Sequence, residues 1–315
     1  MIIKRAILLY ALIFSNCALS LNEYIESAAL SSEGFLALGY SQGSIQLLNI
    51  HTNQITKHIK ASDEMIGSLN FSHDNKMLVS TSGKQVKIWD FNNGPLLSSW
   101  KLRSPFIVTN ASFSPENDTV LVSAYGAVKV YDLKGEEKYK LPEDSTARAL
   151  FNHAGTKIAV SDYNRNLVSV YDVLNRTKVW SVESDTPLDI AFSPIGNRLA
   201  IASSLKIKLF ELDKSNSIYE FDHSEELLHS FDNWFISLKY NNTGNRILFF
   251  DNQGCFFNLD LETKSVRHLQ NLGSIKFSSF LDNGEIIVVT SRKILIIDSE
   301  SMSIMTQKLI NSSSI

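Results

Sequence analysis

The chain lacks the residue patterns that mark disulfide-stapled, membrane-spanning or linker-divided proteins. It has only two cysteines, Cys17 and Cys255, among 315 residues, which excludes a small domain held together by several disulfides. No apolar run reaches the length of about 20 residues that crosses a bilayer. No stretch rich in proline, glycine or serine divides the chain, and no long segment has the hydrophobic period of a helix. A single domain without helical bundles is therefore expected.

The chain also lacks a large excess of either positive or negative charge. The sequence has 30 lysine and arginine residues against 33 aspartate and glutamate residues, a formal net charge of −3. Binding to nucleic acid or to an anionic membrane is favoured by a clustered basic excess. We therefore expect no nucleic acid among the partners and no stable membrane span.

Motifs that carry enzymatic chemistry are missing. The sequence contains no Gly-x-Ser-x-Gly, no His-Glu-x-x-His, no paired-cysteine metal motif and no glycine-rich phosphate loop followed by lysine. The histidines offer no substitute, because they fall in expected turns (His73, His153) or near expected outer strands (His51, His58, His268). We therefore expect no catalytic residue, no metal, no cofactor and no enzymatic activity.

What the chain does have is one pattern repeated seven times between Glu33 and Asp298. Each unit has an apolar strand, a polar turn, a second apolar strand, a short loop and a third strand that ends before an acid. The predicted turns centre on Gly34, Asn75, Asn117, Gly155, Gly196, Gly244 and Gly284. The third strands end at Asn49, which stands in for the first acid, Asp90, Asp132, Asp172, Glu211, Asp260 and Asp298.

The spacing of these ends predicts the fold. Successive ends are 41, 42, 40, 39, 49 and 38 residues apart, a period typical of four-stranded propeller blades. The second strands are nearly continuous apolar runs, as at 247–250 and 286–289, which indicates burial on both faces. Stacking such sheets around an axis buries both faces and leaves only short edges. The predicted fold class is all-β, a seven-bladed β-propeller of four-stranded antiparallel blades.

The units resemble WD repeats, and the resemblance covers about Glu23 to Leu309. The dipeptide that names the family, its softened forms and two Phe-Ser-Pro segments are found at Trp89-Asp90, Tyr131-Asp132, Tyr171-Asp172, Phe113-Ser114-Pro115 and Phe192-Ser193-Pro194. The Gly-His pair that precedes the first strand of each blade in the family is absent from all seven units. In the family that histidine joins a hydrogen-bonded network, so these blades are expected to rely more on apolar packing. The resemblance implies a protein-interaction scaffold.

The first twenty residues predict a secretory signal. Lys4 and Arg5 precede the apolar run 6–14, and small residues at Ala18 and Ser20 precede a cut at Leu21. The predicted organisation is a signal peptide over 1–20, the propeller over 21–310 and a disordered polar tail over 311–315.

Two alternatives compete with this interpretation of the N-terminus. A lipoprotein signal could use Cys17, and an N-terminal strand could complete the last blade. Ile304 to Leu309 are already expected to supply that fourth strand. After signal removal Cys255 would stand alone, most simply as a buried small residue.

The 49-residue spacing marks extra sequence between blades five and six. Such a connection lies on the face where the central channel opens, which the WD-repeat resemblance implies as a partner-binding surface. The predicted partner-binding residues are Asp222, His223, Glu225, Glu226, His229, Asp232 and Trp234. Their acids and apolar neighbours suit a basic or amphipathic partner segment. The alternatives are a short helix packed on the propeller, or a metal site made by Asp222, His223 and His229.

Sequons in expected turns predict glycosylation at Asn117 and Asn175 if the protein enters a eukaryotic secretory pathway. The function expected from the whole sequence is an exported or lumenal, non-enzymatic scaffold, found in the secretory pathway, outside the cell or in the periplasm, with a protein partner. One alternative is an intracellular WD-repeat subunit of a multiprotein complex in the cytoplasm or nucleus. The other is a propeller enzyme with polar groups converging on its channel.

Overall fold

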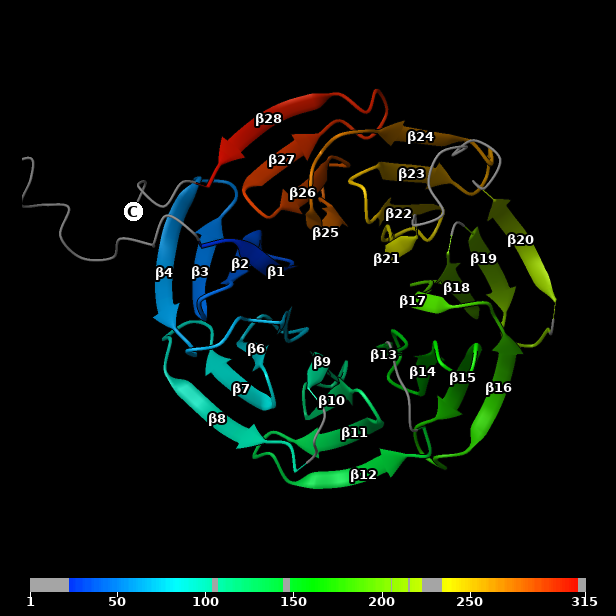
Figure 1. The fold of residues 1–315 in the computed structure, drawn as a ribbon, viewed down its shortest axis with the longest axis horizontal. Coiled ribbons are helices and arrows are strands. Elements are labelled where there is room, and N and C mark those ends of the chain that lie inside the picture. Colours follow the sequence, from blue (N-terminus) through cyan, green and yellow to red (C-terminus); the bar gives the residue numbers. More distant parts are fainter. Residues whose placement is uncertain are drawn as a thin grey trace, which may run out of the picture.

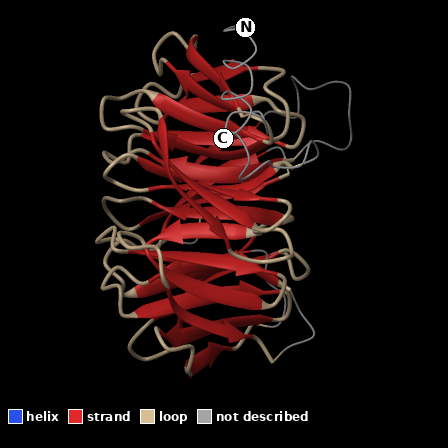
Figure 2. Cartoon of the chain, turned by 90° about the vertical axis from the view of Figure 1, so that its left-hand side faces the viewer, coloured by secondary structure: helices blue, strands red, loops and turns tan. Residues whose placement is uncertain are grey.

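The structure, a computed structural model, describes residues 23–103, 107–143, 148–204, 206–214, 216–222 and 234–310. Within these ranges the strands form seven four-stranded antiparallel sheets arranged as a ring of blades around a central opening (Figure 1). Seen from the side, the strands make a disc with loops on its two faces (Figure 2). The predicted fold class is confirmed.

The first strand of each blade lies beside the central opening and the fourth lies at the rim (Figure 1). Blade one contains β1 (Ile25–Leu30), β2 (Phe35–Tyr40), β3 (Ser44–Asn49) and β4 (Gln54–Lys60). Blade two contains β5 (Ser68–Phe71), β6 (Met77–Ser82), β7 (Gln85–Asp90) and β8 (Leu96–Lys101). Blade three contains β9 (Val108–Phe113), β10 (Thr119–Ala124), β11 (Ala127–Asp132) and β12 (Glu137–Leu141). Blade four contains β13 (Arg148–Phe151), β14 (Lys157–Asp162), β15 (Leu167–Asp172) and β16 (Lys178–Glu183).

The remaining three blades repeat this order. Blade five contains β17 (Pro187–Phe192), β18 (Arg198–Ser203), β19 (Lys206–Glu211) and β20 (Ser217–Asp222). Blade six contains β21 (Phe235–Tyr240), β22 (Arg246–Asp251), β23 (Phe256–Asp260) and β24 (Val266–Leu269). Blade seven contains β25 (Ile275–Phe280), β26 (Ile286–Thr290), β27 (Lys293–Ile297) and β28 (Ile304–Leu309).

Burial explains why the blades stack. The second strands β22 and β26 are buried along almost their whole length, whereas the fourth strands β8 and β28 are mostly exposed. The apolar clusters lie between blades, and each combines residues of two neighbours; one cluster joins β10 and β11 to β13 and β14. A single blade would leave these faces in water, so burial of its apolar area stabilises the ring as a unit.

The predicted turns form because their central residues adopt left-handed backbone conformations. Gly155 has a φ of 69° and Asn117 has a φ of 61°. Glycine adopts this conformation without steric cost, and asparagine tolerates it better than most residues. All seven predicted turn centres have positive φ values.

The aspartates that end five of the third strands cap the following turns. The Asp90 carboxylate accepts a hydrogen bond from the backbone N–H of Asn93 at 2.9 Å, and that of Asp298 accepts one from Ser301 at 2.7 Å. These backbone hydrogen bonds lower the pKa of both carboxyl groups. In blade one the side-chain oxygen of Asn49 makes the equivalent hydrogen bond, accepting from the N–H of His51 at 2.9 Å.

Buried polar contacts accompany the apolar packing on which the blades were expected to rely more. In blade two the indole N–H of Trp89 donates to the Ser80 hydroxyl at 2.8 Å. In blade four the Tyr171 hydroxyl donates to the carboxylate of Glu143, whose residue is only 1% exposed. Burial first, and then this hydrogen bond, raise the pKa of Tyr171. Buried polar contacts therefore replace part of the missing histidine network.

Within the described ranges, the ring closes between blades seven and one without exchange of a strand. β28 pairs with β27, so the last blade has its own fourth strand, as predicted. The N–H of Ile25 donates to the carbonyl of Ser291 at 3.0 Å, and Lys276 pairs with Glu26 at 2.8 Å. An apolar cluster that includes Ile25 and Ile287 fills this junction.

Candidate partner-binding face

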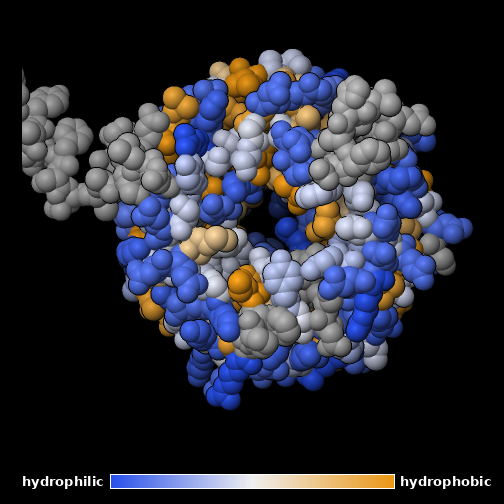
Figure 3. All heavy atoms as spheres, viewed as in Figure 1, coloured by the Kyte–Doolittle hydropathy of each residue, from blue (hydrophilic) through white to orange (hydrophobic). Residues whose placement is uncertain are grey.

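The antiparallel order of the strands divides the loops between two faces of the disc. One face carries the connections between blades and the loops between second and third strands; we call it the inter-blade face. The other carries the turns after the first and third strands; we call it the turn face. The channel opening is bordered by polar and apolar side chains together (Figure 3).

The structure describes only the two ends of the predicted partner-binding connection. Asp222 ends the outermost strand of blade five and pairs with Lys206, whose Nζ lies 2.7 Å from the carboxylate. Hydrogen bonds to Asp222 and Glu220 raise the pKa of Lys206. At the other end, Trp234 directly precedes β21 rather than lying within it. Its N–H donates to the side-chain oxygen of Asn252 at 3.0 Å, and its carbonyl accepts the N–H of Asn252 at 3.2 Å. The two described ends therefore lie at the rim and beside the channel.

The two ends differ in what they offer a partner. Asp222 is already paired, whereas the Trp234 residue is 41% exposed beside the channel. His223, Glu225, Glu226, His229 and Asp232 lie outside the described residues. The rest of the predicted site, the helix alternative and the metal alternative therefore remain predictions. Among described residues, no group of three or more metal-ligating side chains occurs.

Sequence reasoning missed an apolar strip on the same face. It consists of Met65, Ile107 and Tyr125, which are 52%, 56% and 46% exposed. The Met65 loop contacts the end of β6, because the Ser82 hydroxyl donates to the carbonyl of Glu64 at 3.1 Å. The N–H of Val108, next to Ile107, donates to the carbonyl of Gly83 at 2.9 Å, and the N–H of Tyr125 lies 3.4 Å from the carbonyl of Ile107. Because the three residues come from separate loops, the sequence contains no local signal for the strip.

Polar groups inside the channel join blades four, five and six. The Asp189 carboxylate is 1% exposed; one oxygen lies 3.1 Å from Arg148 Nε, and the other accepts the N–H of Leu238 at 2.8 Å. Burial raises the pKa of Asp189, while Arg148 opposes that shift. The pKa of Lys239 is lowered by burial and by Arg148. Asp189 thus links blade five to blade four through an ion pair and to blade six through a backbone hydrogen bond, although its Oδ1 and Arg148 Nε make no hydrogen bond.

The two predicted glycosylation residues differ in their surroundings. Asn175 is exposed in the turn after β15. Asn117 is half-buried, and its side-chain oxygen accepts the N–H of His73 from blade two at 2.6 Å. A glycan on Asn117 would have to leave that contact in place. Cys255 lies just before β23 and is partly buried rather than fully buried; burial raises the pKa of its thiol to about 11.

Comparisons with known proteins agree with this architecture. Residues 50–90 match the family model described as WD domain, G-beta repeat. The Cps50 (Swd1) β-propeller domain of Myceliophteria thermophila superposes with a TM-score of 0.73 over 88% of this chain and 95% of that one, at 15% identity. The chain therefore has a β-propeller fold, and one segment of it, residues 50–90, matches the WD-repeat model.

Two curated proteins are similar over part of their length. A protein of Acanthamoeba polyphaga mimivirus, described as having a BTB/POZ domain and WD repeats, is 24% identical over 220 residues, 66% of this chain and 43% of that protein. The transcriptional corepressor LEUNIG_HOMOLOG of Arabidopsis thaliana is 22% identical over 188 residues, 58% of this chain and 24% of that protein. The matches thus span less than half of either relative. The described residues include no helix long and apolar enough to cross a membrane.

Proposed function

We propose that this protein is a non-enzymatic scaffold that binds a protein partner on its inter-blade face. The observation that carries the proposal is the exposed apolar strip of Met65, Ile107 and Tyr125. Exposed apolar side chains gathered on neighbouring loops are typical of interaction surfaces. The partner segment we expect is amphipathic, with apolar side chains on the strip and basic side chains toward the acidic connection after Asp222.

The mechanism is rigid display. Inter-blade clusters bury the strands that carry these loops, so the strip needs little ordering when a partner binds. Preorganised surfaces lose less conformational entropy on association. The two curated relatives support this proposal by analogy, since their descriptions name a corepressor and a protein with a further BTB/POZ domain.

The scaffold proposal is tested by capture of a partner from native cells with wild-type protein and two triple variants. The strip variant carries Met65→Ser, Ile107→Ser and Tyr125→Ser. The control carries Leu96→Ser, Leu97→Ser and Val179→Ser, three apolar residues exposed by about half on outer strands. We expect the strip variant to lose a partner that the control retains. Equal capture by both variants would contradict binding at the strip.

We also propose export, supported by the charged, apolar and small-residue order of residues 4–20. These residues lie outside the described ranges. Intact mass and N-terminal sequencing of protein from fractionated native cells test the proposal. A start near Leu21 is expected. A retained Met1 in a soluble intracellular fraction would instead favour the alternative of a subunit of an intracellular complex.

A further inference from the structure

A groove opens between blades three and four on the turn face. It has a volume of about 620 Å³ and is lined by residues of both blades. Its apolar floor consists of Val130, Tyr139, Phe151 and Val173, side chains that belong to or pack against one inter-blade cluster. The groove is therefore a wedge between two fixed sheets, and it is separate from the inter-blade face.

At the neighbouring junction, between blades four and five, a larger side chain fills the equivalent space. Tyr139 pairs with Val130 across β12 and β11, as Trp180 pairs with Val170 across β16 and β15. Trp180 bridges to blade five, because its indole N–H donates to the carbonyl of Lys214 at 3.0 Å. Its ring also packs on Phe210 with 5.5 Å between centroids. At the equivalent position of blade three, Tyr139 has a smaller ring than Trp180, and the groove lies beside it.

The walls of the groove are acidic. They hold five carboxylates and two cations: Glu116, Asp118, Asp132, Glu136 and Glu137 against Lys138 and Arg176. Backbone N–H groups lower the pKa of Asp132 and keep it ionised at neutral pH. Glu137 is paired with Lys129 at 2.7 Å, outside the lining set. An excess of negative charge therefore remains, which complements a cationic occupant.

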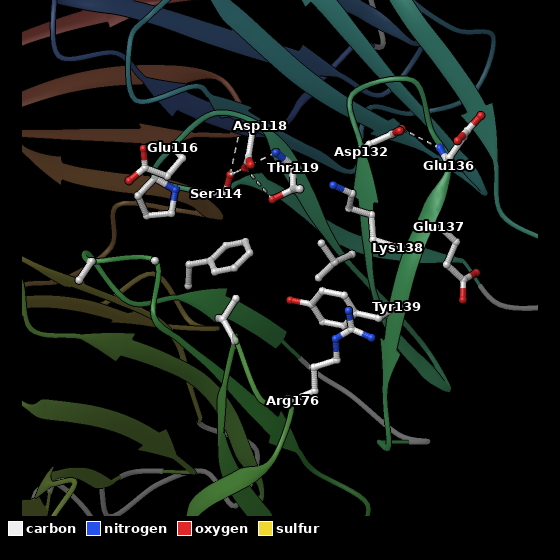
Figure 4. A pocket seen from close by; sticks show the side chains of 16 residues that line it. Ser114, Glu116, Asp118, Thr119, Asp132, Glu136, Glu137, Lys138, Tyr139 and Arg176 are labelled. Carbon is white, nitrogen blue, oxygen red and sulfur yellow. Dashed lines mark hydrogen bonds between the residues drawn. The ribbon is translucent and has the colours of Figure 1, made fainter.

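Arg176 indicates which cation suits the floor. Its guanidinium carbon lies 4.5 Å from the centre of the Tyr139 ring, and it approaches from the blade-four side while the Tyr139 hydroxyl points into the cavity (Figure 4). Asp118 and Thr119 stand on the opposite wall. A planar guanidinium stacks on aromatic rings and pairs with carboxylates better than an ammonium does. The groove thus offers aromatic and carboxylate surfaces together.

We propose that this groove binds an arginine side chain presented by an extended segment of a partner protein. The guanidinium would lie between the phenol of Tyr139 and the carboxylate of Asp118, with its alkyl stem on Phe151 and Val173. This proposal does not depend on binding at the inter-blade face.

The test is fluorescence anisotropy with a dye-labelled hexapeptide of alternating alanine and arginine, and with a matched peptide in which glutamate replaces arginine. The groove variant is Glu116→Gln with Asp118→Asn, which removes two charges and keeps side-chain size. The control is Glu183→Gln with Asp185→Asn, two exposed carboxylates on another surface. A third variant, Tyr139→Trp, fills the wedge as Trp180 does.

We expect the arginine peptide to bind wild type and control equally and to bind the groove and Tyr139→Trp variants at least tenfold more weakly. The glutamate peptide should not bind. Unfolding midpoints measured by circular dichroism identify any variant that fails to fold. The proposal is overturned if the arginine peptide does not bind wild type, if groove and control variants bind it alike, or if the glutamate peptide binds equally.

Discussion

Blades two and four secure the same place in the blade with different chemistry. In blade two the large Trp89 ring is 7% exposed and its N–H reaches the neutral Ser80 hydroxyl. In blade four the smaller Tyr171 reaches the buried carboxylate of Glu143, which also lies 3.4 Å from Lys178 and 3.5 Å from Arg165. The difference teaches that a blade without the network histidine can be held by a large buried ring with a neutral hydrogen bond in one case and by ionic contacts in another.

The largest expected effect comes from removing the buried ring of Trp89 in blade two. Trp89→Ala should lower the free energy of unfolding by about 3–5 kcal/mol, because it deletes a large buried ring and leaves a cavity. Urea unfolding followed by circular dichroism measures the change. An unchanged midpoint would contradict the packing assigned to Trp89.

The next largest effect comes from removing the buried carboxylate of Glu143, which contacts Tyr171 in blade four. Glu143→Ala should cost about 1–3 kcal/mol, because it leaves the buried Tyr171 hydroxyl without its acceptor. The exposed ends of Lys178 and Arg165 can return to water, which limits the loss. The same unfolding measurement applies, with Glu183→Ala as an exposed-carboxylate control. Equal midpoints for both variants would refute a structural role for Glu143.

Ser80→Ala sharpens the comparison further. It keeps the Trp89 ring but removes the partner of its indole N–H, so we expect a loss of about 1 kcal/mol, the usual net value of one hydrogen bond. Adding Ser80→Ala to Trp89→Ala should then cost less than Ser80→Ala alone. Additive losses in this double-mutant cycle would show that the two side chains do not interact.

The smallest effect is a difference in the pH dependence of stability between the Asn49 cap of blade one and the aspartate caps of other blades. The folded-state pKa of Asp90 and Asp298 lies below the ordinary value, so their caps contribute stability above the unfolded pKa, which is lost as pH falls through the lowered folded value. Asn49 cannot titrate. Asp90→Asn should therefore reduce the pH dependence of the unfolding midpoint between about pH 5 and 2. An unchanged slope would show that the Asp90 cap does not contribute to acid sensitivity.

Local features of the fold were predictable from the sequence. Turn centres such as Gly155 and Asn117 are readable because the residue itself must tolerate a positive φ. Capping by Asp90 is readable because donor and acceptor lie three residues apart.

Features that depend on contacts between loops or blades were not predictable. The apolar strip joins Met65, Ile107 and Tyr125 from three loops. Glu143 lies 28 residues before Tyr171, and the other units do not repeat it in a recognisable place. The groove at Tyr139 results from the way side chains of two blades fill their shared wedge. None of these sets is contiguous or periodic.

The sequence by itself determined the number of blades, their strand order and their turns, because strand alternation and left-handed turn residues act within a few positions of the chain. Only the tertiary structure decided which junction stays open, which carboxylates are buried and which apolar loops meet at the channel. Those outcomes depend on packing between segments tens of residues apart, where side-chain volumes and charges from two blades must share one space.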